Sequence, residues 1–235
     1  MRKQERIRLV FDELERRYAG ADTELVYHTP FQLLIAVVMS AQATDKQVNK
    51  VTARLFARVK HPQDVLAMWL DVYREAIRSI GLYKSKAANV YGLSQLLLSQ
   101  EYNAKHSSTT DSKVLQIHEQ YGYYLPVDIK DLQVLPGVGE KTAKVVSHVL
   151  YDTPVIAVDT HVHRVTNRLW IVKTTTPLQT SKQLETIVPE QYKPIAHHGL
   201  ILFGRYHCTA RKPKCVDCPF VDLCPYWKKY LSWKL

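Results

Sequence analysis

Four cysteines constrain this chain most, because all of them stand within the last thirty residues. They are Cys208, Cys215, Cys218 and Cys224, in the pattern C-x6-C-x2-C-x5-C. Four thiolates grouped so closely suit one shared metal centre, either a zinc ion or an iron–sulfur cluster. Structural zinc sites usually show two C-x2-C pairs set well apart, whereas only Cys215 and Cys218 form such a pair here. The uneven spacing therefore favours a [4Fe–4S] cluster over zinc.

Two disulfides in a secreted protein are the other use for four cysteines. The N-terminus MRKQERIRLVFDELERRY has no apolar signal core, since charges interrupt it throughout. The longest apolar run, residues 33–39, is far too short to cross a membrane. We therefore expect an intracellular protein with no membrane partner, whose thiols stay reduced and available for metal.

The charge of the chain suggests a polyanionic partner. Lys and Arg number 32 against 22 Asp and Glu, which gives a net charge of +10 and a pI near 9.4. Many basic proteins share such totals, so the location of the charge matters more. Seven basic and two acidic residues follow position 204, and Arg211, Lys212 and Lys214 fall between the first two cysteines. A metal centre would hold this basic loop in a fixed shape, which predicts a phosphate-binding surface.

The hydrophobic pattern is almost wholly helical. Ile7, Val10, Phe11, Leu14 and Tyr18 recur at three and four residues, which predicts an amphipathic first helix. Thr29-Pro30 predicts a helix start before a buried helix, and Thr44 with Gln47 has the spacing of a capping box for a helix through Phe56. Further helices are expected at 63–80, at 84–99, after Gly139, and at 160–170, 178–188 and 193–204. Residues 154–158 are expected to be a buried connector. The polar segment 99–113 is expected to be an exposed loop, either a functional or disordered one or a harmless insertion.

The stretch LPGVGEKTA at 135–143 joins two helical segments and reads as a helix–hairpin–helix turn. Gly137 and Gly139 leave the main-chain N–H groups around Val138 free to approach a phosphate, and the second helix points its positive end there. The same residues could form an ordinary helix–turn–helix corner. The dense Gly-x-Gly after Leu-Pro favours DNA binding, with Thr142 as a further contact.

Lys141 falls in the first turn of that second helix, where the helix dipole disfavours a cation. The neutral amine is a nucleophile, although a lysine here could equally contact phosphate. Asp159 stands eighteen residues later and can cap the helix that follows it. Beside an activated lysine, its carboxylate could also stabilise positive charge on a sugar and move protons. His161 and His163 diverge on a helix, so they are not expected to form a metal pair.

Six segments in this order resemble the endonuclease III family, whose members are bifunctional DNA glycosylases of the helix–hairpin–helix superfamily. They are LLIAVVMSAQATD at 33–45, IGLYKSKA at 80–87, LPGVGEKTA at 135–143, VIAVDTHVHRV at 155–165, HHGLILFGRYHC at 197–208, and the cysteine run. The resemblance covers nearly the whole chain. It implies that the cysteines hold a [4Fe–4S] cluster and that damaged double-stranded DNA is the partner.

The same resemblance implies roles for single residues. Lys141 is the expected nucleophile and Asp159 its catalytic partner. Gln42 would fill the gap left by a flipped nucleotide, and Leu82 would wedge into the opposite strand. His161 is expected to contact DNA. Removal of oxidised pyrimidines would then be followed by β-elimination on the 3′ side of the abasic site.

The fold implied is all-α and two-lobed. A six-helix barrel lobe is expected at 22–153, with the hairpin at about 128–148, beside a discontinuous cluster lobe at 1–21 and 154–235. We expect a monomer that works in the cytoplasm at the nucleoid.

Three features depart from the family pattern. Glu140 precedes Lys141, where a carboxylate would repel phosphate and favour the charged lysine. Gly199 and Phe203 should alter local packing, and the region around 100–118 is longer than expected. Two rivals remain: a mismatch adenine glycosylase, which normally lacks the lysine and carries an extra C-terminal domain, and a non-catalytic, metal-stabilised DNA-binding protein.

Overall fold

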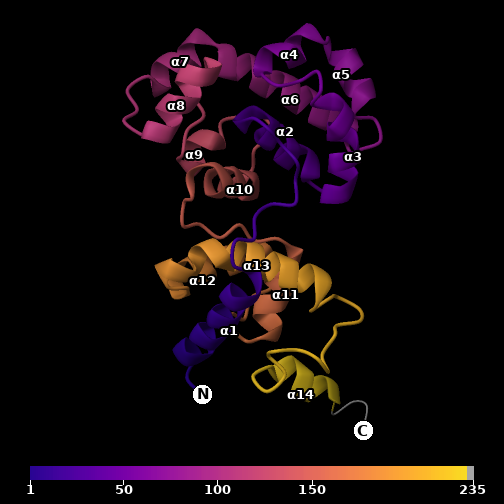
Figure 1. The fold of residues 1–235 in the computed structure, drawn as a ribbon, viewed down its shortest axis with the longest axis vertical. Coiled ribbons are helices and arrows are strands. Elements are labelled where there is room, and N and C mark those ends of the chain that lie inside the picture. The colour runs from indigo at the N-terminus through magenta and orange to yellow at the C-terminus, as the bar shows by residue number, and fades with distance from the viewer. Residues whose placement is uncertain (232–235) are drawn as a thin grey trace. The chain divides into compact units, whose positions relative to one another are not determined.

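The computed structural model describes residues 1–231, and every regular element in that range is a helix. Lys234, one of the basic residues counted above, lies outside it. The described chain divides into two compact units. One comprises Thr23–Thr153, and the other combines Met1–Asp22 with the chain from Pro154 onward. Each unit can be followed by its helix labels in Figure 1.

The Thr23–Thr153 unit is built around α2 (Pro30–Ser40). Every residue from Phe31 to Met39 is buried, because α2 packs against α3, α6 and α10. The Thr29 hydroxyl caps the helix by accepting a hydrogen bond from the Gln32 amide, and Pro30 occupies the first turn, as predicted. The remaining helices are α3 (Asp45–Leu55), α4 (Pro62–Ala67), α5 (Leu70–Ala76), α6 (Tyr83–Leu98), α7 (Gln100–His106), α8 (Ser112–Tyr121), α9 (Ile129–Leu132) and α10 (Glu140–Tyr151).

Two local predictions in this unit were wrong. The segment 63–80 is not one helix, because Trp69 has φ of 56° and separates α4 from α5. Gln47 does not complete a capping box with Thr44. Its side-chain amide instead donates a hydrogen bond to the Ser79 carbonyl at 2.5 Å. The Thr44 hydroxyl alone caps α3, accepting from the Gln47 main-chain N–H at 3.2 Å.

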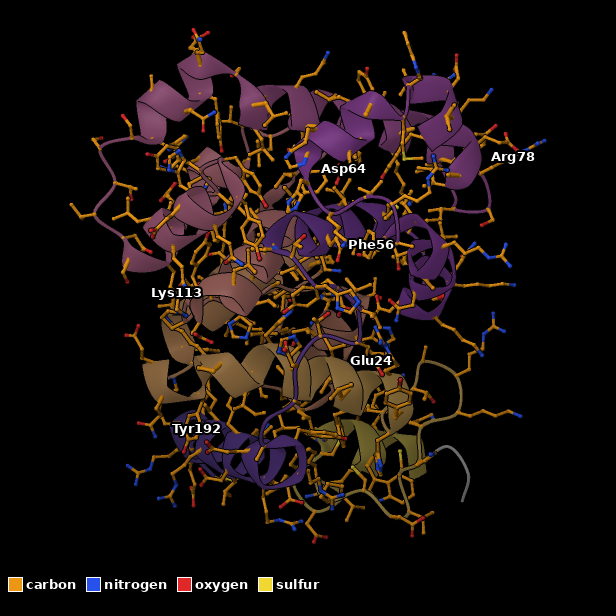
Figure 2. The ribbon with its side chains drawn as sticks, turned by 45° about the horizontal axis from the view of Figure 1, so that its top comes forward. Glu24, Phe56, Asp64, Arg78, Lys113 and Tyr192 are labelled. Carbon is orange, nitrogen blue, oxygen red and sulfur yellow. The ribbon has the colours of Figure 1, made fainter. Side chains whose placement is uncertain are left out.

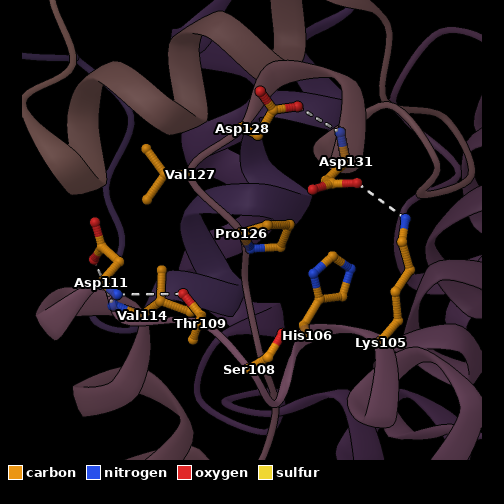
Figure 3. Close-up of a pocket in the computed structure, with 10 residues that line it drawn as sticks. All are labelled: Lys105, His106, Ser108, Thr109, Asp111, Val114, Pro126, Val127, Asp128 and Asp131. Atoms are coloured by element: carbon orange, nitrogen blue, oxygen red, sulfur yellow. Dashed lines mark hydrogen bonds and ion pairs between the residues drawn. The ribbon is translucent and has the colours of Figure 1, made fainter.

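The polar segment 99–113 is also more ordered than predicted. Residues Gln100–His106 form α7, which buries Tyr102 and His106, and α8 begins at Ser112. The Ser99 hydroxyl caps α7, so its polar residues serve as a cap and an outer face rather than a loop. The segment lines a pocket of about 350 Å³, where Lys105 and Asp131 form an ion pair at 3.0 Å (Figure 3).

The second unit is centred on α13 (Lys193–Tyr206), which packs against both α1 (Lys3–Tyr18) and α11 (Thr160–Arg168). The predicted stripe of α1 is buried from Ile7 to Leu14. Tyr192, labelled in Figure 2, stacks on Phe11 with ring centroids 5.7 Å apart and donates a hydrogen bond to the Asp12 carboxylate. Also present are α12 (Pro177–Ile187), the 3₁₀ turn η1 (Glu190–Tyr192) and α14 (Pro225–Leu231).

The predicted connector 154–158 has no regular structure and buries Ile156, Ala157 and Val158. Its main chain is held by two side chains from later helices. The Glu185 carboxylate accepts from the Ile156 N–H at 3.2 Å, and His197 Nδ1 lies 2.9 Å from the Ala157 carbonyl. This anchoring delivers the chain to Asp159 at the start of α11.

Candidate active site and metal centre

The four cysteines come together around one cavity in the second unit. All four are free thiols, and Phe203, His207, Tyr226 and Trp227 are among the other residues that line the cavity. Among residues 1–231, no group of three or more His, Cys, Asp or Glu forms a ready-made site for a single metal ion. The thiols therefore surround a space instead of converging on one point.

Burial sets the chemistry of these thiols. Desolvation raises the pKa of Cys218 to about 11 and also raises the pKa of Cys215 and Cys224. The neighbouring cysteines add to the rise, because thiolates repel one another at close range. Four thiolates so close together, one buried and three half-buried, hence need a strongly positive centre among them. The donor set fits an iron–sulfur cluster, whose ligands are cysteine thiolates.

Two arginines of α11 hold the cysteine loop from one side. The Arg168 guanidinium donates to the Thr209 carbonyl at 2.7 Å, to the Ala210 carbonyl at 2.9 Å and to Cys208 Sγ at 3.4 Å. It also lies 4.3 Å from the centre of the Tyr226 ring, a cation–π contact. Arg164 donates to the Cys208 carbonyl at 3.1 Å and to the Gly204 carbonyl at 2.7 Å. The loop is thus positioned by protein contacts as well as by its thiols.

The predicted hairpin lies between α9 and α10 of the first-described unit. Leu135 and Val138 are buried, so Val138 offers only its main chain to a ligand. Gly137 has φ of 80°, and a Cβ on it would lie 2.8 Å from the Asn89 Cβ. Gly139 has an ordinary φ of −85° and nothing within 4 Å of an added Cβ. Packing therefore requires glycine at Gly137 but not at Gly139, where open space faces the N-terminus of α10.

This contrast predicts different outcomes for two alanine variants. Gly137→Ala should lower the free energy of unfolding by about 1–3 kcal/mol, because a left-handed alanine is strained and its Cβ meets Asn89. Gly139→Ala should cost less than about 1 kcal/mol, the difference between glycine and alanine at an N-cap, yet weaken DNA binding. Urea unfolding and binding to an undamaged duplex measure the two effects. Equal loss of stability in both variants would contradict the assignment.

Lys141 lies in the first turn of α10, as predicted, and its side chain is exposed. Glu140 forms an ion pair with Lys144, whose Nζ lies 3.2 Å from Glu140 Oε1. The Glu140 carboxylate, which departs from the family pattern, is therefore paired with a lysine one turn further along the helix. It need not neutralise Lys141.

Asp159 caps α11, as the sequence indicated. Its Oδ1 accepts from the main-chain N–H groups of His161 at 2.8 Å and Val162 at 2.9 Å. Both bonds use the same oxygen, so the cap fixes the carboxylate without requiring Oδ2. Lys141 belongs to one unit and Asp159 to the other.

Gln42 and Leu82 are both exposed and both have left-handed backbones, with φ of 56° and 60°. The loops that carry them abut, since a Cβ on Gly81 would lie 3.9 Å from the Gln42 carbonyl oxygen. Leu82 is 58% exposed, so it does not contribute to the hydrophobic core. A bulky apolar residue that is both strained and exposed suggests a functional constraint.

The basic loop presents Arg211, Lys212 and Lys214 at the surface beside the cysteine cavity.

His161 and His163 take different partners, Arg164 at 3.1 Å and Thr180 at 2.7 Å, so the expected divergence is confirmed. Phe203 packs edge-on against Phe220 with centroids 5.0 Å apart and lines the cavity. Gly204 allows α13 to approach α11, because an added Cβ would lie 2.9 Å from the His161 Cβ.

Comparison with known proteins agrees with this geometry. Residues 35–190 match the model of the HhH-GPD superfamily base excision DNA repair proteins, and residues 208–224 match the iron–sulfur binding domain of endonuclease III. Endonuclease III of Bacillus subtilis (strain 168) is 42% identical over 219 residues, covering 93% of this chain and 91% of that protein. Endonuclease III of Escherichia coli (strain K12) is 42% identical over 207 residues, covering 88% and 89%.

A solved structure of a trapped endonuclease III–DNA covalent intermediate superposes with a TM-score of 0.83 at 42% identity. The alignment covers 98% of this chain and 100% of that one. A helical fold of base-excision DNA glycosylases is thus established for the described residues. The chain belongs to the endonuclease III family, as the sequence resemblance implied, and carries a [4Fe–4S] cluster. It is a bifunctional DNA glycosylase and AP lyase of base excision repair.

Sequence reasoning missed several residues that shape these sites. Arg164 and Arg168 donate hydrogen bonds to the cysteine loop. Their spacing of four residues, which places them on one face of α11, was the only feature of the sequence that indicated a shared role. Lys86 was missed altogether, because a lysine in an amphipathic helix is usually solvated. It is buried and bonded to the loop before Gln42.

Proposed function

We propose that this enzyme removes oxidised pyrimidines from duplex DNA, with Lys141 as nucleophile and Asp159 as its catalytic partner. One observation carries the proposal: an exposed lysine is the second residue of α10, two residues after Gly139, where the backbone is open. A phosphate held at this helix N-terminus would bring the DNA backbone to the lysine. The hairpin residues Gly137, Val138, Gly139 and Thr142 and the loop residues Arg211, Lys212 and Lys214 supply the grip on the DNA backbone.

Extrusion of the lesion is assigned to the two exposed loop residues. Gln42 would pair with the base left behind, and Leu82 would replace the stacking that is lost on the opposite strand. His161 is a further proposed DNA contact. The unit Thr23–Thr153 would be the barrel domain and the other unit the cluster domain, with Lys141 and Asp159 contributed separately.

The chemistry needs only these side chains. The neutral Lys141 amine attacks the sugar C1′, the C1′–N bond breaks and the base leaves, while the Asp159 carboxylate stabilises positive charge on the sugar. Loss of the amine proton and opening of the sugar ring give a Schiff base between Nζ and C1′. The Schiff base acidifies the C2′ proton, whose removal breaks the C3′–O bond. The strand is cut on the 3′ side, and hydrolysis frees Lys141.

The cluster supplies a folded scaffold for the basic loop when it is bound by Cys208, Cys215, Cys218 and Cys224. Arg168 and Arg164 hold the same loop by hydrogen bonds. The protein's own residues hence carry base removal and strand cleavage.

The partner is damaged double-stranded DNA, and we propose that the enzyme acts on it as a monomer in the cytoplasm, at the nucleoid. No helix within residues 1–231 is long and apolar enough to span a bilayer.

Substitution of Asp159 can distinguish its role as a helix cap from its proposed catalytic role. Asp159→Asn should preserve the cap, since asparagine caps helices as well as aspartate does. It should lower single-turnover base removal by about 10²–10⁴-fold, the usual contribution of a positioned acid–base group. The assay is release of thymine glycol from a duplex, with thermal unfolding as control. Full activity in Asp159→Asn together with a loss of stability in Asp159→Ala would leave Asp159 only the capping role.

A further inference from the structure

Lys86 is a buried cation in the Thr23–Thr153 unit. It lies on the first turn of α6, four residues after Leu82, and is only 4% exposed. Burial lowers the pKa of Lys86, because the charged amine loses its hydration. A lysine in such a position opposes stability unless its donors find partners.

Its partners are two main-chain carbonyls at the C-terminal end of α2. Lys86 Nζ donates to the Met39 carbonyl at 2.8 Å and to the Ala41 carbonyl at 2.6 Å. The last carbonyls of a helix have no partner within the helix and carry its negative end. The amine therefore closes α2 from outside, one residue before the left-handed backbone of Gln42.

The same residue is tied to the second loop through the main chain. The Lys86 N–H donates to the Leu82 carbonyl at 3.0 Å, which is the first helical bond after the left-handed Leu82. One side chain and one amide of Lys86 thus link the loop before Gln42 to the residue that precedes α6. A second link runs from the Gln47 side chain to the Ser79 carbonyl at 2.5 Å.

We propose that Lys86 is a positioning residue for lesion recognition, which holds Gln42 and Leu82 at a fixed separation so that both enter the duplex together. This inference rests on the proposed roles of Gln42 and Leu82. Two side chains that must replace one flipped nucleotide need a rigid common base, since a loose pair would lose the binding energy of each to conformational entropy. Strain at both residues would persist only if surrounding contacts over-determine it, and Lys86 supplies those contacts.

The test separates lesion recognition from general DNA affinity. Dissociation constants are measured for an undamaged duplex and for one with a tetrahydrofuran abasic analogue, which cannot form a Schiff base. Lys86→Met keeps the chain length and removes the donors. We expect it to reduce the preference for the analogue about ten-fold or more, the loss typical of hydrogen bonds from a charged donor, while affinity for undamaged DNA stays within two-fold, about the scatter of an uninvolved site.

A matched control is Ser94→Ala, which removes another buried polar group of α6 whose hydroxyl bonds only within the helix, to the Val90 carbonyl at 2.7 Å. It should leave the preference unchanged. A purely structural role for Lys86 would reduce both affinities together, through the folded fraction, and leave their ratio intact. Should Lys86→Met not fold, Lys86→Gln, with a single amide donor group on a shorter chain, gives the same comparison.

A double-mutant cycle tests whether Lys86 acts through Gln42 and Leu82. In the Gln42→Ala/Leu82→Ala background, Lys86→Met should have no further effect on the preference, because the side chains that it positions are gone. An unchanged ratio for Lys86→Met in the wild-type background, or an equal loss in both backgrounds, would overturn the inference. If Gln42→Ala/Leu82→Ala itself keeps the full preference, the proposed roles of those two residues fail instead.

Discussion

Replacing Lys141 with alanine should abolish covalent trapping on DNA. Borohydride reduces a Schiff base to a stable amine, so the wild-type enzyme should form an adduct with a duplex that carries one thymine glycol. Without the amine no Schiff base with this residue can form, and base release should fall by about 10⁴-fold or more, as for other lost nucleophiles. Lys141 is exposed, so the variant should fold as well as the wild type.

The matched control is Lys130→Ala, which removes the same charge from the exposed face of α9 in the same hairpin. It should weaken DNA binding modestly and leave trapping intact. If Lys141→Ala still forms the adduct, another amine is the nucleophile. If the wild type binds the duplex but gives no adduct, thymine glycol is not its substrate, and an abasic duplex then tests the lyase step alone.

Loss of one cluster ligand should have the largest effect on structure. Cys218→Ala removes a half-buried thiol that lines the cavity, and we expect loss of bound iron and unfolding of the segment from Cys208 to Cys224. Metal binding in such small loops is folding free energy, on the order of 10 kcal/mol for structural zinc sites. The hydrogen bonds from Arg164 and Arg168 to the loop are too few to replace it. Iron content, visible absorbance and proteolysis of the C-terminal segment measure the loss.

Val216→Ala is the control for that experiment, because Val216 stands in the same loop and is 81% exposed. It should retain iron and protease resistance. Affinity for undamaged DNA should drop in Cys218→Ala and not in Val216→Ala, since the basic residues 211–214 lose their fixed shape only in the former. A Cys218→Ala protein with full iron would contradict the assignment of this ligand.

The hairpin between α9 and α10 illustrates how much local sequence could predict. The residues Leu-Pro-Gly-Val-Gly determine a turn by backbone sterics, and Gly137 indeed adopts the left-handed region. The same holds for the caps at Thr29 and Asp159, because a cap depends on neighbours within three residues. The cysteine spacing likewise predicted one shared centre, and the four thiols line one cavity.

Predictions failed where distant residues decide the outcome. The segment 99–113 looks too polar for a helix, yet Tyr102 and His106 find a buried environment in the tertiary fold. Gln47 has the spacing of a capping box, but the Ser79 carbonyl competes for its side chain. The break at Trp69 depends on how α4 and α5 pack against α6, and no local glycine or proline marks it.

By itself the sequence determined most of the long helices, the caps at Thr29 and Asp159, the hairpin turn and the grouping of the thiols, because each depends on periodicity or on neighbours a few residues away. Only the tertiary structure decided which polar residues lie inside. The sequence pattern predicts a solvated side chain for Lys86, whereas in the fold Lys86 is buried and donates a hydrogen bond to a carbonyl at the end of α2. From the sequence, Glu140 was expected to favour the charged form of its neighbour Lys141, but in the fold its carboxylate forms an ion pair with Lys144. Such roles depend on partners brought together by packing, which spacing along the chain does not specify.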